Sequence, residues 1–121
     1  MKLSSVTTTA IAIATLACPV IAMADGLYFE KVAVKTSAEN TCLRFARDVS
    51  RNAHFQNAHT SNTEVAGTID GVYVAITCVG RGQQPAIAIV MGMAPAFDNA
   101  KRVGHTVAGK MQGIVCFDTP C

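Results

Sequence analysis

Three kinds of residue in this sequence could carry chemistry: cysteines, a pair of histidines and an arginine between two glycines. Histidine and cysteine are the usual zinc ligands, and a histidine next to a thiol can activate it as a nucleophile. The stretch Gly80-Arg81-Gly82 has a composition that also occurs in phosphate-binding loops. The chemistry that each kind can perform depends on the element that positions it.

The histidines give a weak signal for a metal site. His54 and His59 stand in one polar segment, residues 54–62, which we expect to be a loop, and His105 is far away in the sequence. A zinc site needs three or four converging ligands with a recognisable spacing, and an H-x4-H pair alone does not provide them. Cys42 lies in the middle of a predicted helical stripe, whereas a reactive thiol is expected at an exposed helix start. The sequence therefore predicts no catalytic residue, no metal ligand and no cofactor.

Arg81 belongs to residues 80–85, which we interpret as the turn of a hairpin. A phosphate-binding loop opens directly into a helix, whose N-terminus binds the phosphate. Here the loop contains no lysine and leads into residues 86–93, an apolar run with strand character. Two glycines and Pro85 suit a chain reversal that starts an edge strand. Arg81 is then a solvated charge at the tip of the turn.

The first 24 residues predict a cleaved secretory signal peptide. Lys2 is followed by an apolar, uncharged run at residues 6–17, and the small residues at positions 22 and 24 suit signal peptidase. We expect cleavage between Ala24 and Asp25, which would place the mature protein in the periplasm or outside the cell, without a membrane attachment. A lipid anchor at Cys18 is the alternative, although threonine occupies position 15, where such a site favours leucine.

Residues 25–121 are expected to form one domain. Because Lys2 is the only charged residue ahead of it, this domain keeps nine of the ten Lys and Arg residues and all eight Asp and Glu residues. The near-neutral balance provides no basic stripe for a phosphate backbone, which argues against a nucleic-acid partner. A domain this small buries only about 60–65% of its unfolded surface. The four cysteines that remain, an even set, therefore predict two stabilising disulfides among Cys42, Cys78, Cys116 and Cys121.

Hydrophobic periodicity predicts the element order β-α-β-β-β-α. Strands are expected at residues 27–34, 64–69, 72–79 and 86–93. A helix at residues 37–53 would begin at a T-x-x-E capping box of Thr36 and Glu39, and a second helix would run from Asp98 to about residue 115. Asp70-Gly71 predicts a type I′ turn. The expected fold is an α+β two-layer sandwich, with an antiparallel sheet of three or four strands and both helices on one face.

Alternation along the two longest strands assigns their side chains to two faces of the sheet. The helix-covered face is expected to hold Val72, Val74, Ile76, Cys78, Ile87 and Ile89. The open face is expected to hold Tyr73, Ala75, Thr77, Val79, Ala86, Ala88 and Val90. Because these residues are small and largely uncharged, we expect the open face to contact a second copy of the chain or another exported protein.

The same assignment predicts which cysteines pair. Cys42 lies at the centre of the apolar stripe of the first helix and Cys78 on the helix-covered face, so a bridge between them would join helix and sheet. Cys116 points away from the stripe of the second helix, and the four residues between it and Cys121 can turn. We expect Cys116 and Cys121 to form the second disulfide.

Residues 64–92, EVAGTIDGVYVAITCVGRGQQPAIAIVMG, followed by a helix near Asp98, resemble a group of small exported bacterial proteins of unknown function. The shared features are a glycine-bearing turn, a V-x-V-x-I-x-C strand, a second apolar strand and a closing helix. The resemblance implies the α+β fold and export, and it implies no substrate or site residue.

The lack of a recognisable catalytic constellation leads us to expect a non-enzymatic binding module. Such a module could be an inhibitor or immunity-type partner of another exported protein. The alternative is a metal- or ligand-binding protein, or an enzyme, that uses His54, His59 and Arg81, because function in small domains is often carried by loops.

Overall fold

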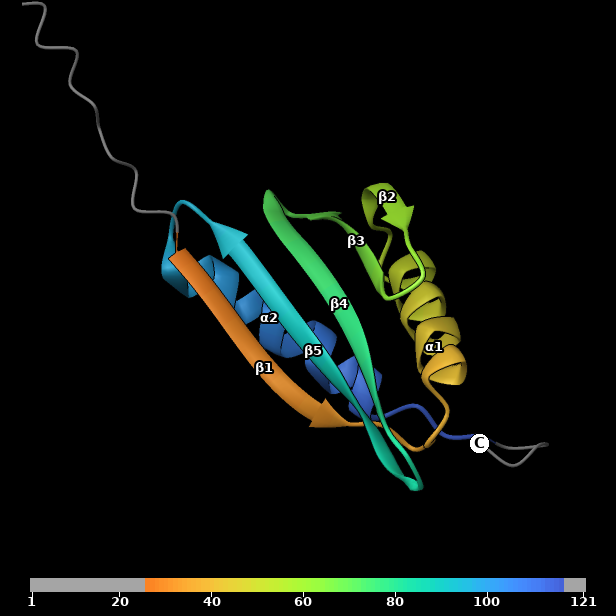
Figure 1. Ribbon diagram of the computed structural model, residues 1–121. Helices are drawn as coiled ribbons and strands as arrows, with labels where there is room; N and C mark the ends of the chain where they lie inside the picture. Colours follow the sequence, from red (N-terminus) through yellow and green to blue (C-terminus); the bar gives the residue numbers. More distant parts are fainter. Residues whose placement is uncertain (1–25, 117–121) are drawn as a thin grey trace, which may run out of the picture.

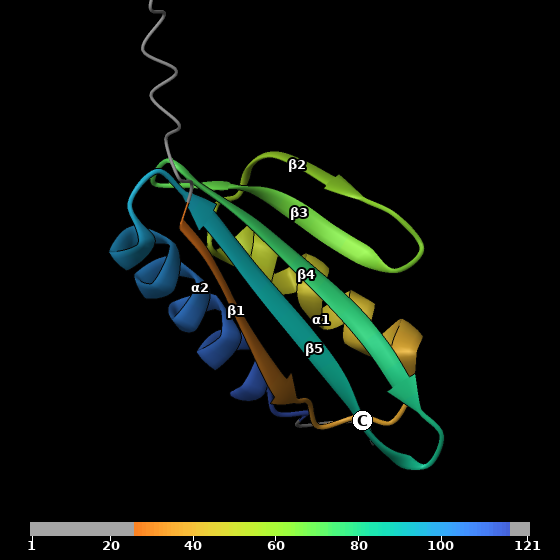
Figure 2. The same ribbon diagram turned by 60° about the vertical axis from the view of Figure 1, so that its left-hand side comes forward.

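The protein consists of two layers, an antiparallel sheet and two helices that cover the same face of it (Figure 1, Figure 2). A computed structural model describes residues 26–116. The strands, in the order in which they pair across the sheet, are β1 (Gly26–Ala33), β5 (Gln84–Ala94), β4 (Val72–Arg81), β3 (Glu64–Ile69) and β2 (Gln56–Thr60). The helices are α1 (Glu39–Asn52) and α2 (Phe97–Gln112). The predicted α+β sandwich is confirmed, and its sheet has five strands instead of three or four.

The additional strand, β2, lies in the segment that the sequence predicted to be a loop. All five of its residues are exposed, so no alternation of buried and exposed side chains marks it in the sequence. It pairs with β3 at Gln56–Thr68 and at His59–Ala66, with a register shift between the two pairs. Backbone pairing with β3, rather than burial of side chains, therefore forms this edge strand.

Two tight turns set the register of the central strands. Asp70 and Gly71 have φ angles of 49° and 76°, which confirms the type I′ geometry predicted between β3 and β4. The turn between β4 and β5 is the predicted hairpin turn, and Gly82 within it has φ 69°. The expectation that this turn starts an edge strand is wrong, because β5 lies between β1 and β4. Pro85 is tolerated there because it precedes the residues of β5 that pair with β1.

The two helices do not begin as the sequence predicted. Ala38 is the N-cap of α1, and its backbone N–H donates a hydrogen bond of 3.1 Å to Thr36 Oγ1. Glu39 does not complete a capping box, because its Oε2 accepts a hydrogen bond of 3.1 Å from the backbone N–H of Gly80. This carboxylate thereby joins the start of α1 to β4. In α2, Asp98 stands in the first turn and is not the capping residue.

A disulfide between Cys42 and Cys78 joins α1 to β4, as predicted, with a Cα–Cα distance of 6.0 Å. Both cysteines are buried in the apolar core. Cys116 is also disulfide-bonded. Its predicted partner Cys121 and the predicted cleavage site Ala24–Asp25 lie outside the described residues, so that pairing and that site stay predictions.

The helix-covered face of the sheet differs from the prediction on one strand. Its buried residues on β4 are the predicted Val72, Val74, Ile76 and Cys78. On β5 the prediction is wrong. Ala88 and Val90, which pair with buried residues of β4, face the helices together with Ala86, whereas Ile87 and Ile89 lie on the opposite face.

The close approach of α2 explains why β5 presents its smaller residues to the helices. A Cβ atom on Gly92 would lie 2.6 Å from the backbone oxygen of Ala100, and a Cβ atom on Gly104 would lie 2.8 Å from Cδ1 of Tyr28. Contacts this short leave no space for a side chain, so α2 packs almost directly on the backbone of β5. Isoleucine or methionine on this face of β5 would push the helix away from the sheet.

We predict that Gly92→Ala destabilises the protein, because the new methyl group would collide with the backbone of α2. The free energy of unfolding should fall by about 1–3 kcal/mol. Gly109→Ala is the matched control, since a Cβ atom there meets nothing within 4 Å. It should raise the free energy of unfolding by up to about 1 kcal/mol, because alanine favours a helix. Chemical denaturation measures both, and equal effects would contradict the close packing.

Removal of the Cys42–Cys78 disulfide should also destabilise the fold. The two cysteines are 36 positions apart in the sequence. In the chain-entropy description, a loop of this length corresponds to about 3–4 kcal/mol of stability. The double variant Cys42→Ala/Cys78→Ala should show this loss in chemical denaturation under oxidising conditions. A reducing agent should then have a smaller effect on the variant than on the wild-type protein, and an equal effect would assign the stability to another disulfide.

Candidate functional site

His54 follows the C-cap residue of α1, and its backbone terminates the helix. It has a positive φ of 56°, and its N–H donates a hydrogen bond of 3.1 Å to the carbonyl of Arg51. The N–H of Phe55 donates one of 2.9 Å to the carbonyl of Ser50. These two bonds form a Schellman motif, in which glycine usually occupies the left-handed position. His54 therefore stands at the point where the chain leaves α1 for β2.

His59 and Arg81, the other candidate residues from the sequence, lie far from each other. His59 is exposed on β2 and pairs with Ala66, which in turn pairs with Ala75 of β4. Arg81 is six residues further along β4, or about 20 Å. Its Nε donates a hydrogen bond of 2.8 Å to the carbonyl of Pro85 across the hairpin turn. Among residues 26–116, no three His, Cys, Asp or Glu side chains gather in a way that could hold a metal ion.

The third histidine belongs to a polar cluster that the sequence did not reveal. Glu30 Oε2 accepts a hydrogen bond of 2.7 Å from the hydroxyl of Tyr28 and lies 2.8 Å from Nδ1 of His105. The hydrogen bond from Tyr28, followed by that from His105, lowers the pKa of Glu30, and the same carboxylate raises the pKa of Tyr28. Because His105 is on α2 and Glu30 on β1, the cluster joins the helix to the edge of the sheet.

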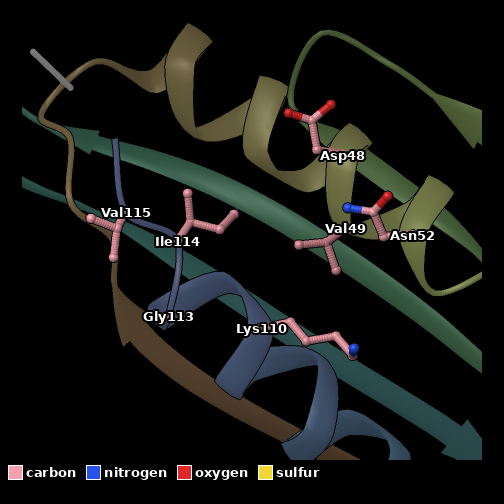
Figure 3. A pocket seen from close by; sticks show the side chains of 7 residues that line it. All are labelled: Asp48, Val49, Asn52, Lys110, Gly113, Ile114 and Val115. Carbon is pink, nitrogen blue, oxygen red and sulfur yellow. The ribbon is translucent and has the colours of Figure 1, made fainter. Parts of the chain in front are cut away.

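A cleft lies between the two helices (Figure 3). Its volume is about 470 Å³, which is in the range of small-ligand sites. It is lined by Asp48, Val49 and Asn52 of α1, Lys110 of α2, and Gly113, Ile114 and Val115 after α2. Asp48 forms an exposed ion pair with Arg51 on the same helix. The lining can contact a polar molecule, and these side chains include no pairing of a nucleophile with a base.

The open face of the sheet, opposite the helices, carries the most prominent apolar surface of the described chain. It holds five of the seven exposed large apolar residues, namely Leu27, Phe29, Tyr73, Val79 and Met93. Ile87, Ile89 and Met91 stand on the same face and are half-buried. The prediction of an uncharged open face holds for β4. On β5, the residues expected on the open face, Ala86, Ala88 and Val90, lie on the helix-covered face. Larger side chains of β5 occupy the open face instead.

Sequence reasoning missed Leu27, Phe29 and the large side chains of β5 as members of this surface. The alternation in β5 did separate two sets of residues, but both sets are apolar, so hydrophobicity could not orient them. In β1 the alternation is irregular because each set contains a charged residue, Glu30 in one and Lys31 in the other. The small size of one set in β5, with glycine at position 92, was the signal for close packing against a helix.

Comparison of the sequence with protein-family models and with curated proteins finds no match. The resemblance to small exported bacterial proteins therefore stays a prediction. Within residues 26–116, no helix is both long enough and apolar enough to span a membrane.

The polar cluster of β1 and α2 should give the protein a pH-dependent stability. Because the pKa of Glu30 is lowered in the folded state, its contribution is present above its unfolded pKa of about 4.3 and is lost as the pH falls further. Glu30→Gln should therefore destabilise the protein at pH 7, and its difference from wild type should shrink below about pH 4. Thermal denaturation from pH 3 to pH 7 measures this.

The variant Tyr28→Phe provides the control, because the hydroxyl of Tyr28 is the largest cause of the lowered pKa. In this background, Glu30→Gln should have a smaller pH-dependent effect. An undiminished effect would show that the tyrosine does not act on Glu30.

Proposed function

We propose that this protein is a non-enzymatic binding module that acts through the open face of its sheet. The observation that carries the proposal is the exposure of large apolar side chains on this face: Phe29 is 61% exposed, Leu27 57% and Met93 43%. A one-sided antiparallel sheet normally presents polar side chains to water. An apolar face of this extent is typical of a protein contact surface.

The positions of the other candidate residues support binding rather than catalysis. His54 has its role in the helix end, His59 and Arg81 are at separate places, and the Tyr28–Glu30–His105 cluster joins α2 to β1. Tyr28 and Glu30 face α2, away from the open face, and Arg81 stands at the far end of β4, where it pairs with Gln84 beside the hairpin turn. Among the described residues, the most extensive candidate site is thus the apolar open face of the sheet.

Export is part of the proposal, with the mature protein in the periplasm or outside the cell. The Cys42–Cys78 disulfide is compatible with an oxidising compartment, where such bonds persist. In such a compartment the disulfide between α1 and β4 would compensate for the small core of the domain.

Phe29→Ser/Met93→Ser should abolish protein capture by the immobilised, oxidised mature protein. Both side chains are exposed, so the fold should persist and only the apolar contact should be lost. The immobilised protein is incubated with a mixture of two components, the exported proteins of the source organism and an untagged copy of the chain. The proteins that remain bound are then quantified. Val115→Ser, which removes an exposed apolar side chain elsewhere, is the control and should retain capture. Unchanged capture by the double variant, or a bound metal without any protein, would refute the proposal.

A further inference from the structure

We propose that the open face binds a second copy of this chain, with two sheets packed face to face about a two-fold axis parallel to the strands and between β4 and β5. This inference rests on the proposed function, because it names the partner of the same surface. Three features of the face support it: the positions of its charges, the sizes of its side chains and its area.

The strand register arranges the open face in rows that run across the strands. One row consists of Lys31 on β1, Ile89 on β5, Thr77 on β4 and Glu64 on β3. Thr77 Oγ1 lies 3.4 Å from Glu64 Oε2, which confirms that the two side chains share this face. Apart from Arg81, which pairs with Gln84 beside the hairpin turn, Lys31 and Glu64 are the only charged residues at the paired positions of these four strands on this face. They therefore stand at opposite ends of one row.

A two-fold axis along the strands exchanges the two ends of each row. It would place Lys31 of one copy opposite Glu64 of the other, and Glu64 opposite Lys31, so that one contact generates two ion pairs. Facing sheets are about 10 Å apart, a gap that a lysine and a glutamate side chain span together. Lys31 lies on the edge strand β1 and Glu64 is the first residue of β3, so both charges stay partly hydrated, which avoids the cost of full burial.

A two-fold axis across the strands gives the opposite result. Such an axis keeps each strand against its own copy. Lys31 would then meet Lys31 or the apolar Phe29 of the partner, depending on where the axis crosses. Either contact is unfavourable for a lysine. The charge pattern therefore selects the axis parallel to the strands.

In one row, large and small side chains would face each other under the same operation. The next row consists of Phe29, Met91, Ala75 and Ala66, so that its large residues are on β1 and β5 and its alanines on β4 and β3. Ala66 and Ala75 are 0% and 1% exposed, beneath their larger neighbours. The axis places Phe29 opposite Ala66 and Met91 opposite Ala75. The larger side chains of one copy would then lie above the lower part of the partner's face, where Ala66 and Ala75 are covered by their own neighbours.

The area of the face suffices for a specific contact. On this face β1, β5 and β4 each present four paired apolar, polar or charged residues besides Arg81, and β3 presents three; at a strand spacing of about 4.8 Å and intervals of about 6.8 Å along each strand, they cover about 500 Å². Two copies would bury about 1,000 Å² in total, close to the lower limit of specific interfaces. The expected complex is therefore a weak dimer.

Exchange of the two charges tests this arrangement. Lys31→Glu and Glu64→Lys each convert both ion pairs into like-charge contacts, so each variant should dimerise at least about tenfold more weakly than wild type. An equimolar mixture of the two variants should regain wild-type association, because every exchanged residue then faces an opposite charge. The double variant Lys31→Glu/Glu64→Lys should regain it as well. Sedimentation equilibrium of the oxidised mature protein measures all four cases.

Lys101→Glu is the matched control, since it changes the same charge on the exposed surface of α2. It should leave dimerisation unchanged. A wild-type protein that is monomeric at about 1 mM, or a mixture of the two single variants that fails to associate, would overturn the proposal. If the wild type is monomeric but Phe29→Ser/Met93→Ser still abolishes capture of another protein, the open face remains a binding surface and only the second copy is excluded as its partner.

Discussion

The contact between α2 and the backbone of β5 determines how the rest of this structure is arranged. Gly92 and Gly104 let the helix approach so closely that a side chain has no place between the two elements. Only small or medium residues fit on that side of β5, and the alternation of the strand then sends isoleucines and methionines to the other side. The apolar open face is therefore a consequence of how tightly the covered face is packed.

The second helix and the first are held to the sheet by different means. α2 depends on shape, with its glycine and alanine contacts reinforced by the hydrogen bonds of Glu30 at the sheet edge. α1 depends on specific links to β4, namely the Cys42–Cys78 disulfide and the hydrogen bond from Gly80 to Glu39. Because each helix has its own attachment to the sheet, the two helices need little direct contact with each other, and a cleft remains between them.

Local chemistry in the sequence was enough to predict most of the architecture. Asp70-Gly71 indicated its turn because few residue pairs accept two positive φ angles, and the Cys42–Cys78 pairing followed from the two stripes on which these residues lie. β2 could not be predicted, because backbone pairing alone forms it. The orientation of β5 and the role of Glu39 depend on which distant element comes close, and a local pattern contains no such information. The Tyr28–Glu30–His105 cluster was hidden for the same reason, since its members meet only after α2 docks.

Since both faces of β5 are apolar, this strand is prone to aggregate with other chains whenever its edges are not paired. Residues 86–94 carry no charge and no polar side chain, and their composition is that of segments that assemble into intermolecular cross-β structure. Pro85 and Pro95 stand at the two ends of this segment, and neither can donate the backbone hydrogen bond by which a growing fibril would extend. In the folded protein, β5 is enclosed between β1 and β4, so neither of its edges is available to another chain. We therefore expect the two prolines to limit aggregation of the unfolded chain, whereas in the folded protein β1 and β4 give that protection.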